Sequence, residues 1–400
     1  MTQALAGFRV LDLTNVLAGP FAAYQLALLG AEVVKVEAPE SGDLARQLGA
    51  DPALNAKRMG ASFLAQNGGK KSITLDLKSN AGRAVFLRLV ETAAVVVENF
   101  RPGVMDRLGF GYEELRAVNP RLVYCAISGF GQTGPMRDAP AYDQIVQGLA
   151  GVMSITGDAA SAPLRVGYPM CDTIGGLTAA FAIAGALVRR LQTGEGAFID
   201  VSMLESTIVT MGWIVSNYLI AGQTPRPMGN DNFTAAPSGT FKTDRGLLNI
   251  AANKQEQFEA LARLLGREDL IADPRFASRE GRLRNRTELT LEIERALARN
   301  SAEEWERLMN AAGVPAGRVF TVPEILESPQ IIERALLKRF GDTPGLDAPL
   351  TVVRAGFKMS GGDPDVTIPP PTLGQHTDEV LAAAGYTADQ IRELRATGAI

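Results

Sequence analysis

The sequence predicts an α/β protein built on an open, doubly wound (Rossmann-like) parallel sheet, with a smaller α+β domain inserted. Two observations indicate this fold. Short β-branched and apolar runs alternate with helical patterns through the first half of the chain. Near residue 222 the alternation gives way to prolines and a hairpin pattern. The chain of 400 residues is long enough for two domains.

The strands expected in the sheet are short runs rich in Val, Ile and Leu. They are residues 8–13, 32–37, 73–77, 94–98, 122–127 and 198–202. A helix is expected over 21–29, since Pro20 precedes it and Gly30 follows it. Helical patterns separate most of the runs, so neighbouring strands are expected to be parallel.

The change of texture begins at Gly222, where the segment up to Pro237 is rich in proline and breaks any long helix. Two short apolar runs then flank Asp244-Arg245-Gly246, which predicts a β-hairpin. Helices are expected to follow. They are placed over 256–265, 288–298 and 302–312. This part of the chain is therefore predicted to form the smaller α+β domain.

Composition excludes several classes of protein. The formal net charge is -4, so no long-range field attracts nucleic acid. The two cysteines, Cys125 and Cys171, are too few for a disulfide framework or a zinc cluster, and they are expected to be free and buried. The N-terminus lacks a signal-peptide pattern, and the most apolar run, 174–188, is shorter than a membrane span. We expect a cytoplasmic protein with a buried helix there and no membrane contact.

The single histidine, His376, restricts the chemistry. A Ser-His-Asp triad or a His-rich metal site would have to use it, and no G-x-S-x-G or H-E-x-x-H motif is present. His376 is expected to be structural or on the surface. We therefore expect a reaction carried by carboxylates, backbone groups and cations, with no metal and no permanently bound cofactor.

Two loops at predicted strand ends have residue types that suit a ligand. The turn 15–20 lacks the glycines of a dinucleotide fingerprint, but it offers helix N-terminal N–H groups to a phosphate. In the other loop Asn99 can donate and accept, Phe100 can stack on a flat ring, and Arg101 and Arg107 can pair with phosphate. A solvated loop is the alternative, and the residue types leave both open.

Asp172 stands at the start of the long apolar helix. It can be a simple helix N-cap, which is a common use of Asp. It can also be a nucleophile, because a helix N-terminus favours the ionised carboxylate and only that form attacks. Gly175 and Gly176 would then make room for a bulky thioester. Local sequence leaves both interpretations open.

A set of ordered blocks resembles class III coenzyme A (CoA) transferases, the formyl-CoA transferase/CaiB-BaiF type. Each block alone is weak, but together they span nearly the whole chain in the expected order. The blocks are residues 5–14, 17–20, 29–37, 71–78, 97–103, 131–135, 142–143, 193–200 and 374–377.

The resemblance implies a fold, an interlocked homodimer and a site. Residues 1–221 would begin the large CoA-binding domain, 222–318 would form the small α+β domain, and 319–400 would return to complete the large domain. Asp172 would be the catalytic nucleophile, and the CoA thioester would be a substrate. The implied CoA contacts are Leu17, Ala18, Leu75, Asp76, Leu77, Lys78, Asn99, Phe100, Arg101, Arg107, Tyr142 and Asp143.

Departures from the formyl-CoA transferase pattern argue against oxalate as the acid. Leu17 replaces a Gln, Leu48 replaces a Trp, and 228–232 lacks a run of glycines. Ala38 and Pro140 stand where basic residues are expected. The pattern is closer to the branch that moves CoA from succinyl-CoA to dicarboxylic acids such as glutarate. The expected reaction is that transfer, through an aspartyl anhydride and thioester.

Two alternatives remain at this point. An α-methylacyl-CoA racemase-type epimerase of the same fold would use a His-Asp pair, but residues 138–142 contain no histidine. A non-catalytic CoA-binding protein would not need Asp172 in its full motif. The resemblance therefore favours the transferase.

Overall fold

The computed structural model describes residues 3–400. Contacts divide the chain into two compact units: Met1–Val152, Arg165–Gln223 and Ile332–Ile400 form the first, and Met153–Leu164 with Thr224–Ile331 form the second. The inserted unit thus extends to Ile331, past the expected 318, and includes residues 153–164. No break in composition marks these additions, which explains why the sequence did not indicate them.

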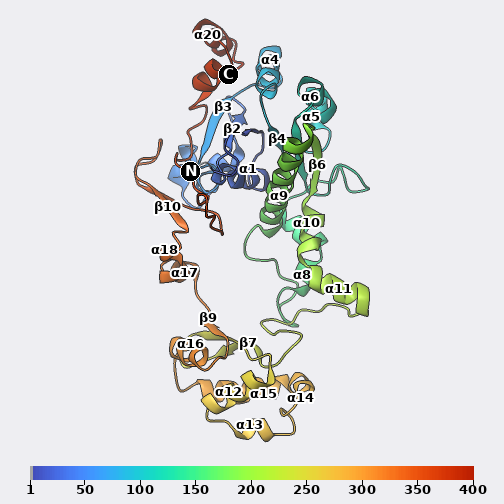
Figure 1. Ribbon diagram of the computed structural model, residues 1–400, viewed down its shortest axis with the longest axis vertical. Helices are drawn as coiled ribbons and strands as arrows, with labels where there is room; N and C mark the ends of the chain where they lie inside the picture. The colour runs from blue at the N-terminus through green and yellow to red at the C-terminus, as the bar shows by residue number, and fades with distance from the viewer. Residues whose placement is uncertain (1–2) are drawn as a thin grey trace. The chain divides into compact units, whose positions relative to one another are not determined.

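The first unit is built on a six-stranded parallel sheet in the order β3-β2-β1-β4-β5-β6 (Figure 1). Every neighbouring pair is parallel. The prediction of a doubly wound parallel sheet is confirmed. The strands are β1 (Arg9–Asp12), β2 (Glu32–Glu37), β3 (Lys70–Thr74), β4 (Val95–Glu98), β5 (Val123–Ser128) and β6 (Ala197–Ser202).

The position of β3 differs from the expected 73–77. The strand begins at Lys70 and ends at Thr74, because the chain turns where the Asp76 side chain accepts the Lys78 N–H and Ser79 caps the next helix. Two lysines at the start of the strand hid it from a pattern based on apolar residues. Lys70 is nevertheless fully buried, since it is paired with Asp12.

Helices cover both faces of the sheet, because alternate strand residues point to opposite sides. Val10 packs in one core layer, with α1 (Ala18–Leu28), α9 (Met170–Thr193) and α10 (Met203–Thr210). Leu11 packs in the other, with α4 (Asn80–Val90), α5 (Val104–Leu108) and α6 (Tyr112–Val118). The C-terminal helices α19 (Thr377–Ala383) and α20 (Ala388–Ala396) join this second layer, so both ends of the chain contribute to the unit.

The second unit contains a three-stranded antiparallel sheet, β7-β8-β9, and its own core. The predicted hairpin is present as β7 (Ser238–Lys242) and β8 (Leu247–Ala251), and β9 (Ala316–Arg318) pairs with β8. The core helices are α12 (Gln255–Leu264), α13 (Asp269–Ala272), α14 (Arg279–Arg284), α15 (Arg286–Leu297) and α16 (Ala302–Ala311). Helices α12, α15 and α16 lie close to the three expected helices, whereas α13 and α14 were not predicted.

The remaining elements are short. In the first unit β10 (Leu337–Phe340) pairs with β11 (Leu350–Val353) in a separate antiparallel ladder. The other helices are η1 (Leu44–Gln47), α2 (Pro52–Ala56), α3 (Ala61–Leu64), α7 (Asp143–Leu149), α8 (Val152–Ile155), α11 (Gly212–Ala221), α17 (Val322–Leu326) and α18 (Pro329–Glu333).

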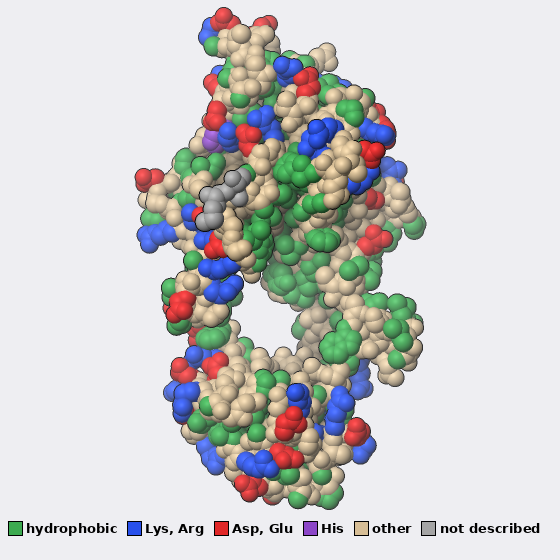
Figure 2. All heavy atoms as spheres, viewed as in Figure 1, with side chains coloured by type: hydrophobic (Ala, Val, Ile, Leu, Met, Phe, Trp, Pro, Cys, Tyr) green, Lys and Arg blue, Asp and Glu red, His purple; other side chains and the backbone are tan. Residues whose placement is uncertain are grey.

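Helix α9 is long and apolar enough to cross a membrane by length and composition alone. One side of the helix faces the core, where Ala179, Ile183 and Leu187 are buried against the sheet. The opposite side exposes large apolar residues, so the expectation of a buried helix holds for one side only. Figure 2 shows hydrophobic side chains gathered over α9 and α10. The exposed large apolar residues of α9 are Leu177, Phe181, Val188 and Leu191.

Candidate active site

The predicted contact residues follow the carboxyl ends of parallel strands. Residues 13–17 follow β1, 75–78 follow β3 and 99–107 follow β4. Strand β1 lies between β2 and β4, so the chain winds outward in both directions from this point. Ligands of open α/β sheets bind beyond the strand ends at such a switch point. The sheet therefore gathers these loops where a ligand site is expected.

Side chains from three neighbouring segments hold the loop after β1 in one conformation. The Asn99 amide accepts from the Asn15 N–H and donates to the Asn15 carbonyl, each at 2.8 Å. Asp43 accepts the Val16 N–H at 2.9 Å, and Lys35 donates to the Thr14 carbonyl at 2.8 Å. Val16 has a φ of 68°, which a β-branched residue adopts only where its surroundings impose it.

A buried ion network lies under this loop. Lys70 Nζ is 2.8 Å from Asp12 Oδ2, and Lys35 Nζ is 2.9 Å from Asp43 Oδ2. Burial opposes ionisation of Asp12, but the two lysines lower its pKa below the ordinary value. Burial lowers the pKa of Lys70 to about 8, against the opposing effect of Asp12. The network positions the loop, and no residue pattern in the sequence indicated it.

The predicted phosphate contacts are exposed cations. Arg101, Arg107 and Lys78 are exposed, and within residues 3–400 none of them has an ion pair. Unpaired guanidinium groups beside a strand end can take phosphate oxygens in bidentate fashion. Phe100 is half-buried and packs against the core layer of α4 and α5. These positions fit the predicted role of a CoA surface.

The other predicted contacts divide between surface and interior. Tyr142 is exposed and begins α7, and Leu17 occupies the N-cap position of α1. Ala18 and Leu75 are buried, and both oxygens of Asp143 are engaged by the protein. Asp76 and Leu77 are partly buried. The buried members can contact a ligand through backbone atoms only.

Asp172 is the third residue of α9, whose N-cap is Pro169. Its side chain makes no capping bond, so the simple N-cap interpretation is wrong. Within the part of the chain that the structure describes, its carboxylate has no hydrogen bond and no ion pair. Burial, and then the charge of Asp143, raise the pKa of Asp172 to about 7. The carboxylate is thus harder to ionise than the expected effect of the helix N-terminus suggests.

Gly175 and Gly176 serve helix packing, and their expected role in making room for a thioester stays a prediction. A Cβ on Gly176 would lie 2.5 Å from the carbonyl oxygen of Ala18, and one on Gly175 would lie 3.0 Å from Cγ of Met203. Their absent side chains therefore let α1 and α10 approach α9. As a result, the first turn of α1 packs against α9 at Gly176, which is one helical turn after Asp172.

His376 has a structural contact, as the sequence suggested. Its Nδ1 accepts the backbone N–H of Ser72 at 3.2 Å, and its own N–H donates to the Ser72 carbonyl at 2.9 Å. Burial lowers its pKa, so the ring is neutral near pH 7. The histidine joins the C-terminal segment to β3.

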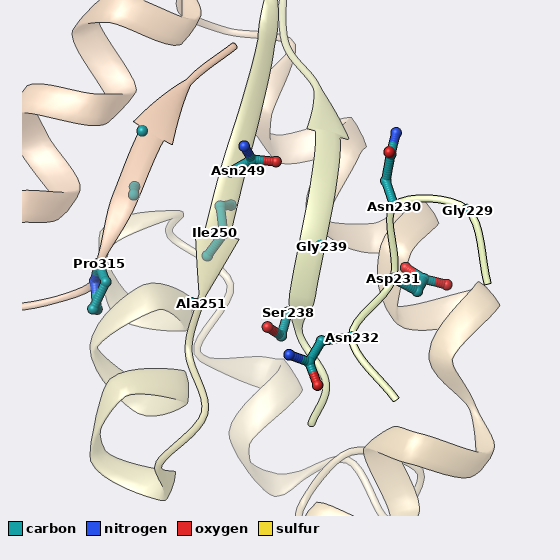
Figure 3. A pocket seen from close by; sticks show the side chains of 12 residues that line it. Gly229, Asn230, Asp231, Asn232, Ser238, Gly239, Asn249, Ile250, Ala251 and Pro315 are labelled. Carbon is teal, nitrogen blue, oxygen red and sulfur yellow. The ribbon is translucent and has the colours of Figure 1, made fainter. Parts of the chain in front are cut away.

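Each unit contains cavities, and one in the first unit borders the loop after β4 at Gly103, Met105 and Asp106. One of about 530 Å³ in the second unit is lined by the loop Gly229–Asn232, β7 and β8, with Asn249 on the sheet face (Figure 3). The cavity at the loop after β4 has a volume of about 410 Å³ and also borders Glu98, Tyr112 and Arg137. Burial raises the pKa of Glu98 to about 8. Asp172 lines neither cavity.

Known proteins similar to this chain share one chemistry. The sequence matches CoA-transferase family III over residues 5–377. It is 41% identical over 336 residues to an acetyl-CoA:oxalate CoA-transferase of Acetobacter aceti, covering 84% of this chain and 85% of that protein. It is 36% identical over 402 residues to succinyl-CoA:glutarate CoA-transferase of Mus musculus, covering 100% and 90%. The crystal structure of a CAIB/BAIF family protein from Brucella suis matches with a TM-score of 0.85, at 34% identity and 96% and 100% coverage.

Proposed function

The chain belongs to CoA-transferase family III and transfers CoA between an acyl-CoA and a carboxylic acid, and we propose that the donor is succinyl-CoA and the acceptor a dicarboxylic acid. The mouse relative, named for succinyl-CoA and glutarate, covers this whole chain and supports that choice. The Acetobacter relative, named for acetyl-CoA and oxalate, supports a second pair of substrates. Oxalate therefore belongs in any screen, although the departures at Leu17 and Leu48 count against it.

The proposed reaction uses Asp172 as a covalent carrier. Its carboxylate attacks the thioester carbonyl, the C–S bond breaks, and CoA leaves as the thiolate, giving a mixed anhydride. The thiolate then attacks the aspartyl carbonyl, which releases the donor acid and leaves CoA on Asp172. The acceptor carboxylate displaces the thiolate and forms a second anhydride. Attack of the thiolate on the acceptor carbonyl yields the new acyl-CoA and frees Asp172.

The observation that carries this proposal is the state of the Asp172 carboxylate. It is half-buried in the first turn of a long helix and has neither an ion pair nor a hydrogen bond among the described residues. Its oxygens are not among the enclosed side-chain atoms of the described residues, so they stay open to an incoming ligand. An unpaired carboxylate with a pKa of about 7 is available to a substrate carbonyl. Burial also protects an anhydride from water.

CoA is proposed to lie over the carboxyl ends of β1, β3 and β4. The exposed cations Arg101, Arg107 and Lys78 would bind its phosphates, and Phe100 would contact its adenine ring. The loop at Leu17 would direct the pantetheine arm toward Asp172, since the first turn of α1 packs against α9 near Gly176. No metal or permanently bound cofactor takes part in this proposal.

We propose that the protein acts as a homodimer in the cytoplasm. Helices α9 and α11 expose apolar residues that a partner subunit would cover: Leu177, Phe181, Leu191, Trp213, Leu219 and Ile220. Exposed apolar surface of this extent is a common mark of an interface. Both cysteines are free and buried, which fits a reducing compartment.

The experiment that tests the proposal is covalent trapping. The protein is mixed with succinyl-CoA and then with hydroxylamine or borohydride, and the modified peptide is identified by mass spectrometry. We expect modification at Asp172 that is absent in Asp172→Ala. Loss of trapped CoA on addition of glutarate, oxalate or other acids then identifies the acceptor. If acyl-CoA binds but never labels Asp172, the proposed carrier role fails, and exchange of the α-proton in deuterated water tests the epimerase alternative.

A further inference from the structure

Gln147, on α7, is a completely buried side chain beside the candidate nucleophile helix. Its Nε2 donates to Asp143 Oδ2 at 2.7 Å and to the carbonyl of Tyr168 at 3.2 Å. Its Oε1 accepts the N–H of Val166 at 2.8 Å. One amide thus makes three bonds to two separate segments, and all of them belong to the first unit.

The same amide orients Asp143, which acts on the start of α9. Asp143 Oδ1 accepts the backbone N–H of Cys171 at 2.8 Å, while Oδ2 accepts from Gln147. Pro169 at the N-cap has no side chain that can take this N–H, so a residue of another helix satisfies it. The residue just before Asp172 is therefore bonded to α7.

We propose that Gln147 is a positioning residue that holds Asp172 in place for attack on the thioester, an inference that rests on the proposed carrier role of Asp172. Gln147 fixes residues 166–168, which lead into α9, and through Asp143 it fixes the first turn of the helix. The first turn of α9 then has a single position relative to α7. A displacement of 1 Å at a reacting group can reduce a rate about 100-fold.

The geometry also shows why an amide is required at this position. The Asp143 carboxylate and the Tyr168 carbonyl need donors, whereas the Val166 N–H needs an acceptor. Among neutral side chains, only the amides of Asn and Gln carry two N–H donors and a separate acceptor oxygen, which these three bonds use. Leucine at this position would keep the volume and leave the Val166 N–H without its acceptor. Asp143 Oδ2 would keep only the Arg165 guanidinium at 3.8 Å, and the Tyr168 carbonyl would keep only the Met170 N–H at 2.8 Å.

The test measures the rate at which succinyl-CoA labels Asp172 in a single turnover, together with kcat and the KM for acyl-CoA. For Gln147→Leu we expect labelling and kcat to fall about 10- to 100-fold, while the KM changes less than about threefold. The matched control is Gln66→Leu, since Gln66 is also a buried glutamine but lies outside the site. We expect its kinetics to equal those of the wild type.

A paired exchange keeps the inference testable if Gln147→Leu does not fold. In Asp143→Asn the new amide N–H₂ would face Nε2 of Gln147, donor against donor. Adding Gln147→Glu restores an acceptor there and leaves the net charge of the pair unchanged, but it removes the donor to the Tyr168 carbonyl. We expect Asp143→Asn to label slowly and the double variant to regain part of the rate, at least about threefold, because one of the two bonds is restored.

The outcomes separate this inference from the proposed function. If the wild type labels Asp172 and Gln147→Leu, folded by circular dichroism, labels at the same rate, Gln147 has no positioning role. If the double variant is no faster than Asp143→Asn, the hydrogen bond between the two side chains does not matter and the inference also falls. If the wild type never labels Asp172, the carrier role itself is wrong, and the inference falls with it.

Discussion

The backbone carbonyl of Ala18 lies 2.5 Å from the place where Gly176 would carry a Cβ, so the first turn of α1 and the nucleophile helix meet backbone to backbone. This contact joins two parts of the chain that the site needs together. Leu17, which precedes Ala18, ends the loop after β1, and Asp172 lies one turn before Gly176. The separation of α1 and α9 therefore sets the distance between the proposed CoA loop and the nucleophile.

Gly176→Ala should destabilise the protein and slow the transfer reaction. The methyl group would meet backbone, which cannot rotate away, so we expect a cost of about 1–3 kcal/mol in the free energy of unfolding. Gly175→Ala should cost less, because its nearest neighbour at 3.0 Å is the flexible side chain of Met203. Urea unfolding of the two variants measures the order. Equal stabilities would mean that α1 and α9 are not held this closely.

Asn99→Leu should weaken both acyl-CoA binding and the fold. The substitution removes both bonds to Asn15, worth roughly 2 kcal/mol together, and we expect the KM for acyl-CoA to rise about 10- to 30-fold as the loop loosens. Asn119→Leu is the control, since the Asn119 amide likewise bonds backbone away from the site: it donates to the carbonyls of Val90 and Ala93 and accepts the N–H of Arg121. It should lower the stability and leave the KM unchanged. A similar KM change in both variants would show that Asn99 is only structural.

The fold could be predicted largely because apolar runs mark buried parallel strands whatever their tertiary surroundings. Strand β2 was predicted at 32–37 and lies at Glu32–Glu37. Strand β3 was misplaced, since Lys70 begins it and is neutralised by Asp12, which is distant in sequence. A buried ion pair between strands leaves no local pattern, so a prediction based on hydropathy misses it.

The candidate site could be predicted in part. The basis was the resemblance to the family and not the hydropathy pattern that predicted the fold. Local sequence left Asp172 undecided between a cap and a nucleophile, and the resemblance to the family pointed to it. Gln147 and the bonds of Asp143 could not be foreseen, because nothing marks a glutamine four residues after an aspartate as a buried hub. The packing role of Gly176 could not be foreseen, since the neighbour that requires a glycine, Ala18, lies far away in the sequence.

Asp172→Asn should stabilise the folded protein at neutral and alkaline pH. Burial raises the pKa of this carboxyl from 3.8 to about 7, so the folded state binds its proton more tightly than the unfolded state does. The wild type therefore loses stability relative to the variant as the pH rises from about 4 to 7, by at most about 4 kcal/mol and roughly 1–3 after solvent screening. Unfolding midpoints at pH 4 and pH 8 check the sign. A difference that is larger at pH 4 would contradict the raised pKa.

Phe181→Asp should separate the proposed dimer. Phe181 is 83% exposed on the outer side of α9, one turn from the exposed Leu177, and exposed apolar surface of this kind is a common mark of an interface. A buried carboxylate without a counter-charge at an interface costs several kcal/mol, enough to raise the dissociation constant at least about 100-fold. Light scattering after size exclusion measures the mass. Leu291→Asp is the control, because Leu291 is 50% exposed on α15 of the other unit, and its variant should keep the mass of the wild type. A wild type that is monomeric at micromolar concentration, or a Phe181→Asp variant that stays dimeric, would leave the outer side of α9 without a role in assembly.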